Sequence, residues 1–188
     1  MKESVTSRDK LNAAGAAGIA LSVIPVLYYY LYMRVYSASV LDGVETSHAL
    51  SLILSLMWVV KLVLGIVLLK LFMQSFSRRY PGVTASDAVK FGVLSSAASG
   101  LIIGAFTMAY HLLIDPEMIS KLISYLLESP YAPLISGSGS AMDSVASSYP
   151  AATLITNFFY CTLYGYVLSA ILSRRIRYFE PDSESEEN

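Results

Sequence analysis

Charged residues are scarce in this sequence, and cysteine occurs only once. Of the 188 residues, 14% are charged and 55% are hydrophobic, and the mean hydropathy is +0.56. So few charges cannot give a compact domain a surface compatible with water, which excludes a soluble globular protein. The one cysteine, Cys161, excludes an intramolecular disulfide, and its place inside an apolar segment favours packing over reactivity.

Known catalytic and nucleic-acid-binding motifs are also missing. The sequence has no glycine-rich phosphate loop, no HExxH, no GxSxG and no basic patch of the kind that binds nucleic acid. His48 and His111, with Asp115 or Glu45 nearby, match no spacing typical of metal ligands. We therefore predict that the protein is not an enzyme, with no catalytic or metal-binding residues, no cofactor and no nucleic-acid partner.

Long apolar segments make up most of the chain. Each reaches the roughly 20 residues that cross a hydrocarbon core, and none alternates polar with apolar residues as a strand would. The segments are residues 11–33, 49–72, 88–114 and 151–173. They predict an all-α membrane protein, a bundle of four transmembrane helices within residues 1–177 that contacts the lipid bilayer. The acidic residues 178–188 are predicted to form a disordered cytoplasmic tail.

A cleaved signal peptide is the alternative interpretation of the first segment, because basic residues precede it. Its apolar run is longer than the usual core of a signal peptide, which is about 7 to 15 residues. Its small residues (NAAGAAG) stand at its beginning, whereas a cleavage site would need them at its end. We therefore expect a retained span.

The distribution of lysine and arginine predicts the orientation of the spans. Basic residues cluster before the first span, between the second and third, and after the fourth, whereas the other two connections hold only Arg34 and Lys121. Loops rich in lysine and arginine stay in the cytoplasm. We therefore predict that both termini are cytoplasmic. Tyrosines at the end of the first span (YYYLYMRVY) are interpreted as an interfacial aromatic belt.

The connection between the third and fourth spans, residues 115–150, begins with the pattern of a short helix. Asp115 suits an N-cap, Pro116 suits the first helical position, and apolar residues then recur at helical spacing. We predict a short outer interfacial helix, either lying on the membrane surface or capping the bundle. The small, polar stretch SGSGSAMDSVASS that follows, within residues 134–150, is predicted to be a flexible linker.

Small residues recur every four positions along the third and fourth spans. They are Ala88, Gly92, Ser96, Gly100 and Gly104 in the third span, and Cys161, Gly165, Ser169 and Ser173 in the fourth. Such stripes let helices approach closely in lipid. We predict an up-and-down bundle with the third helix at its centre. The stripe could pack against another helix of the same chain, against a partner protein or against a second copy, and the sequence leaves these three alternatives open.

Lys61 is the one charge deep inside a span. It lies about 13 Å along the helix from Lys70, and a lysine at the centre of a membrane helix costs about 2.5–3.5 kcal/mol. No aspartate or glutamate occurs in any span, so the chain supplies no counter-charge there. The alternatives are loss of the proton, contact with the Tyr160 and Tyr164 hydroxyls and the Trp58 ring, or an anionic group from a partner or lipid.

The stretch RRYPGVTASDAVKFGVLSSAASGLIIGAFTMAYHLLIDPEMISKLISYLL, followed later by LSAILSRR, resembles the bacterial membrane proteins grouped as the domain of unknown function 4199 family. The resemblance covers residues 1–177. It rests on short features: Gly82, Phe91, Gly92, Tyr110, Pro116 and Glu117, and the basic end of the last span. It implies a four-helix protein of the bacterial inner membrane with no assigned activity, and a membrane-associated glycosyltransferase as a partner.

Two hypotheses about function follow. The first is a non-enzymatic inner-membrane protein that acts as an accessory or scaffolding partner in envelope biogenesis, with Lys61 as a charged contact in the membrane. The alternative is a small transporter or channel subunit in which Lys61 contacts an anion. Transport would require a wet cavity that reaches Lys61. A membrane enzyme is disfavoured because the spans contain no acid/base pair.

Overall fold

The computed structural model describes residues 7–38, 48–128 and 139–178. These parts are helical, with no strand among them. Four helices are long and apolar enough to cross a membrane, which confirms the predicted all-α membrane fold. The four are α1 (Ser7–Tyr36), α2 (His48–Arg79), α3 (Ala85–Ala109) and α6 (Gly139–Ser173). Two shorter elements follow α3, namely the π-helical turn η2 (Tyr110–Ile114) and the helix α4 (Met118–Glu128).

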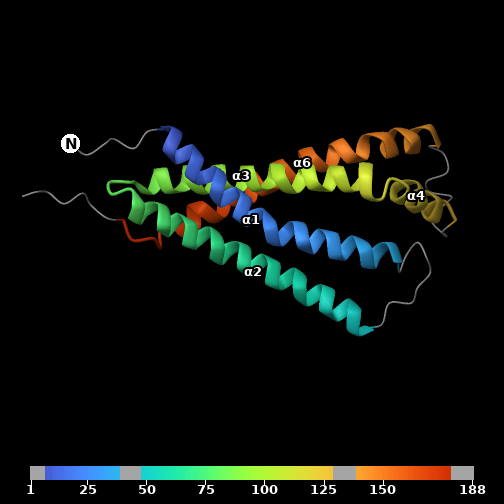
Figure 1. Ribbon diagram of the computed structural model, residues 1–188, viewed down its shortest axis with the longest axis horizontal. Helices are drawn as coiled ribbons and strands as arrows, with labels where there is room; N and C mark the ends of the chain where they lie inside the picture. Colours follow the sequence, from blue (N-terminus) through green and yellow to red (C-terminus); the bar gives the residue numbers. More distant parts are fainter. Residues whose placement is uncertain (1–6, 39–47, 129–138, 179–188) are drawn as a thin grey trace, which may run out of the picture.

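The four long helices alternate in direction, as expected for an up-and-down bundle (Figure 1). The beginning of α1, the turn between α2 and α3 and the end of α6 therefore lie at one end of the molecule, with α4 at the other. Basic residues gather at the first of these ends. They are Arg8, Lys10, Arg78, Arg79, Arg174, Arg175 and Arg177.

The turn between α2 and α3 is held by local hydrogen bonds. Gly82 has a φ of 87°, a left-handed conformation that favours glycine. Thr84 then caps α3: its side chain accepts a hydrogen bond from the backbone N–H of Asp87, while the Asp87 carboxylate accepts one from the backbone N–H of Thr84. Lys10 of α1 lies 3.3 Å from the same carboxylate, so an ion pair ties α1 to the start of α3.

The central position of α3 comes from its small side chains. It packs along α6 on one side and along α1 on the other. A Cβ atom added to Gly104 would lie 2.8 Å from the carbonyl oxygen of Leu154, and one added to Gly100 would lie 2.9 Å from that of Asn157. Because these contacts are with backbone, α3 and α6 can approach this closely only where glycine is present.

Further members of the predicted stripes lie in the same interface. A Cβ atom on Gly92 would meet Ser169, and one on Gly165 would meet Ser96. All three glycines of the α3 stripe, together with Gly165, are buried. The stripe therefore faces another helix of the same chain. The face of α3 toward α1 is equally close, since a Cβ on Gly18 would lie 2.8 Å from the carbonyl oxygen of Ser95.

α2 is tightly packed only near its carboxyl end. Its buried residues are Leu69, Met73, Phe76 and Ser77. The Phe76 ring stacks on Phe91 of α3 with centroids 4.3 Å apart. Residues 48–68, about 30 Å of helix, contain no buried residue, and this part of α2 diverges from α3 in Figure 1. The amino-terminal part of α2, residues 48–68, is therefore largely exposed on the outside of the bundle.

Two predicted boundaries are corrected by the structure. The stretch expected to be a flexible linker is helical from Gly139 onward, because α6 runs through it and through Pro150. Alanine, serine and methionine are compatible with a helix, and serine hydroxyls bond back to the carbonyl of Ser144. The predicted short helix is confirmed, but α4 starts at Met118 rather than next to Asp115. Residues 134–138 and 179–188, which include most of the predicted tail, lie outside the described parts.

Candidate functional site

Lys61 projects from the loosely packed part of α2 toward α1. Its Nζ atom lies 4.4 Å from the centroid of the Tyr28 ring, within the range of a cation–π contact. The predicted ring was Trp58, which shares α2 with Lys61 and is 49% exposed. The cation–π partner is instead Tyr28, because α1 lies close enough to α2 for the Tyr28 ring to contact Lys61. Tyr28 therefore belongs to this site and not only to the interfacial belt.

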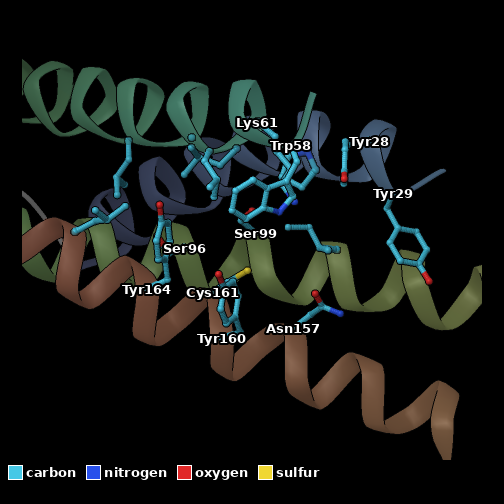
Figure 2. Close-up of a pocket in the computed structure, with 17 residues that line it drawn as sticks. Tyr28, Tyr29, Trp58, Lys61, Ser96, Ser99, Asn157, Tyr160, Cys161 and Tyr164 are labelled. Atoms are coloured by element: carbon cyan, nitrogen blue, oxygen red, sulfur yellow. The ribbon is translucent and has the colours of Figure 1, made fainter. Parts of the chain in front are cut away.

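A cleft of about 240 Å³ surrounds Lys61 between α1, α2, α3 and α6. Figure 2 shows the side chains that these four helices contribute to it. The structure brings together the four residues that the sequence singled out as a polar contact: Lys61, Trp58, Tyr160 and Tyr164 all line the cleft. Tyr160 and Tyr164 stack with ring centroids 6.0 Å apart on the α6 side.

Further polar groups line the same cleft. Ser96 and Ser99 of α3 and Asn157 and Cys161 of α6 contribute to its wall, although most of the lining is apolar. Ser96 is also the residue that packs on Gly165, so the close α3–α6 contact positions part of the cleft wall. Gly92 and Gly104 do not line the cleft. Their part is to hold α3 against α6.

The charge of Lys61 has no counter-ion in the described parts of the chain. The ion pairs found there are Lys10–Asp87 and Lys121–Glu117, both near helix ends. No hydrogen bond joins Lys61 to the Tyr160 or Tyr164 hydroxyl, which was one of the predicted alternatives. A cation–π contact contributes about 0.5–2 kcal/mol, less than the roughly 2.5–3.5 kcal/mol cost of placing lysine at mid-membrane. Lys61 can therefore still accept an anionic partner.

A second polar cluster lies where α3 ends. The Tyr29 hydroxyl and the Nε2 atom of His111 are 2.8 Å apart in a hydrogen bond. Tyr110 and His111 are consecutive and both buried, which the wider π-helical turn of η2 permits. The Nδ1 atom of His111 and the Tyr110 hydroxyl have no partner among the described residues. His48 is exposed at the start of α2, and the described residues contain no group of three or more metal-ligating side chains.

Tyr29→Phe is expected to lower the free energy of unfolding by about 1–2 kcal/mol, because it leaves the buried imidazole of His111 without a hydrogen bond. Tyr30→Phe is the matched control, since Tyr30 is 40% exposed. Thermal unfolding in mild detergent measures the difference. Equal melting temperatures for the two variants would show that the Tyr29–His111 bond contributes nothing.

Comparison with known proteins yields no match among family models, curated proteins or solved structures. The function must therefore be argued from the site itself. Its principal features are an exposed amino-terminal part of α2, a cleft within the bundle and a lysine that has no counter-ion among the described residues. This arrangement can bind an anionic group. The described cleft offers no carboxylate beside Lys61 that would form an acid/base pair with it.

Proposed function

We propose that the chain is a non-enzymatic, multi-pass protein of the bacterial inner membrane that serves as an accessory or scaffolding partner of another membrane protein in envelope biogenesis. Both termini would be cytoplasmic, because α1 begins and α6 ends at the basic end of the bundle. The resemblance to the domain of unknown function 4199 family supports the bacterial inner membrane and suggests a glycosyltransferase as the partner. Both assignments are part of the proposal.

The observation that carries this proposal is the exposure of α2. Residues 48–68 contain no buried side chain, whereas α3 is buried along its length. Apolar exposure alone would only mean contact with lipid. Here, however, the exposed part of α2 borders a cleft that contains Lys61, and a charge at this depth normally faces protein or water. A partner helix on α2 would supply the missing protein surface.

A transporter or channel subunit is the second candidate. The observation in its favour is that the cleft reaches Lys61 and is lined by Gly65 and Trp58. Anion transport would require this cleft to be filled with water. The missing intramembrane carboxylates disfavour proton or cation transport and leave an anion as the substrate. Water access to the cleft separates the two candidates.

Quantitative co-purification from native membranes in mild detergent tests the accessory role. The wild-type protein is compared with Leu56→Trp on the exposed part of α2 and with Leu101→Trp on the exposed face of α3. We expect one stoichiometric partner with the wild type and with Leu101→Trp. Leu56→Trp should lose most of it, because overpacking an interface costs about 1–3 kcal/mol, or about 5- to 150-fold in affinity. If the wild-type protein purifies without a partner, the accessory role is wrong.

A further inference from the structure

We propose that a transmembrane helix of a different protein packs along α2 and α6 over the cleft, and that this helix carries an aspartate or glutamate that enters the cleft and pairs with Lys61. The inference rests on the proposed accessory role and adds the chemistry of the partner. It follows from the depth of Lys61, from the composition of the spans and from the geometry of the cleft. The first two observations each disfavour a different occupant, and the third indicates where the partner helix would lie.

The depth of Lys61 disfavours a phospholipid head group. Lys61 lies about 20 Å along α2 from His48 and about 27 Å from Arg79, so it is near the middle of the helix. Phosphate groups lie at the membrane interface, and a lysine side chain reaches only about 6 Å. A carboxylate on a transmembrane helix can instead be positioned at any depth, and charged residues inside membranes pair with one another.

The composition of the spans disfavours a second copy of this chain. The acidic residues described in the four spanning helices are Asp9 and Asp87, in the first turns of α1 and α3, and Asp143, near the start of α6. Asp9 and Asp87 do not line the cleft, and Asp143 stands about 26 Å along α6 from Tyr160. A second copy would therefore bring a second Lys61 to the same depth and no carboxylate. Charge complementarity requires a different chain.

The geometry of the cleft indicates where the partner helix would lie. α2 and α6 contact each other little, and the side chains at their shared border are exposed: Trp58 by 49% and Tyr160 by 62%. Gly65 lines the cleft on the α2 side, and a Cβ atom added to it would meet nothing within 4 Å. A helix lying along α2 and α6 could thus place an acidic side chain in the cleft beside Lys61.

A photo-crosslinking experiment in native membranes tests the inference. A photoreactive amino acid replaces Gly65, where there is room for it, and in the control it replaces Leu101 on the exposed face of α3, which is 48% exposed and does not line the cleft. We expect Gly65 to crosslink to a peptide within a transmembrane helix of the co-purified partner, and that helix to contain an aspartate or glutamate. The Leu101 position should give lipid adducts.

Charge substitutions complete the test. Lys61→Leu is expected to reduce the co-purified partner at least about tenfold, because it leaves the partner's carboxylate unpaired. Lys70→Leu, the same change near the end of α2, should not. Neutralising the carboxylate in the crosslinked helix should give the same loss as Lys61→Leu. Combining Lys61→Glu with a lysine at the partner position should restore binding.

The outcomes separate the two proposals. A stoichiometric partner whose crosslinked helix has no acidic residue, or whose binding survives Lys61→Leu, overturns the ion pair and leaves the accessory role standing. Crosslinks from Gly65 only to lipid or only to a second copy of the chain also overturn the ion pair. If the wild type has no partner at all, both proposals are wrong.

Discussion

Gly104→Ala is expected to lower the stability of the folded bundle by about 1–3 kcal/mol, the usual cost of overpacking a close contact. The added methyl group would lie 2.8 Å from the carbonyl oxygen and 2.9 Å from the Cα atom of Leu154. Both atoms belong to the backbone of α6, so the contact can be relieved only by moving one helix away from the other. Thermal unfolding in mild detergent, followed by loss of helical signal, measures the change.

Gly15→Ala is the matched control, and it should have the opposite sign. No heavy atom lies within 4 Å of the position that its Cβ would occupy. Alanine is favoured over glycine inside a helix by roughly 0.5–1 kcal/mol. The control variant is therefore expected to be slightly more stable than the wild type. If Gly104→Ala were as stable as Gly15→Ala, the close contact between α3 and α6 would be wrong.

The positions of the four spans were predictable from sequence because length and apolarity alone determine them. The packing partner of the α3 stripe was only partly predictable. A repeat of small residues every four positions defines one side of a helix, but it does not say which helix lies there. The structure identifies α6, through the contacts of Gly100 and Gly104.

The start of α6 and the position of Tyr28 were not predictable by the same arguments. Residues 139–148 are small and polar, a composition shared by linkers and by helix ends that lie outside the hydrocarbon. Tyr28 stands among tyrosines typical of an interfacial belt, and its contact with Lys61 depends on how α1 and α2 are aligned. An antiparallel pairing of the two helices was the one available signal, because it brings the later part of α1 beside the earlier part of α2.

The exposure of α2 has a comparable explanation. α2 is apolar on all sides, so its sequence has no polar face that would mark the side turned away from protein. Lys61 identifies only the side of α2 that faces a polar group. The sequence therefore predicts a span at α2 but cannot indicate that residues 48–68 lie apart from α3. The cleft, which depends on that divergence, follows only from the structure.

Cys161 is expected to be inaccessible to a charged, membrane-impermeant thiol reagent in native membranes. It is the only cysteine of the chain, and it lines the cleft together with Lys61. If the cleft opens toward lipid or a partner helix, the charged reagent cannot enter it, and labelling should be at least about tenfold slower than in detergent, because moving a charged group from water into an apolar site is unfavourable. N-ethylmaleimide, which crosses membranes, should label Cys161 in both preparations.

Two engineered cysteines serve as controls in a Cys161→Ser background. Ser86→Cys and Ser120→Cys replace exposed residues at opposite ends of the bundle, so in membrane fragments open on both sides both should react with the charged reagent. Rapid labelling of Cys161 by that reagent would mean that water enters the cleft. Such access would favour the transporter hypothesis, because a lysine in a wet cavity is hydrated and does not require a partner's carboxylate.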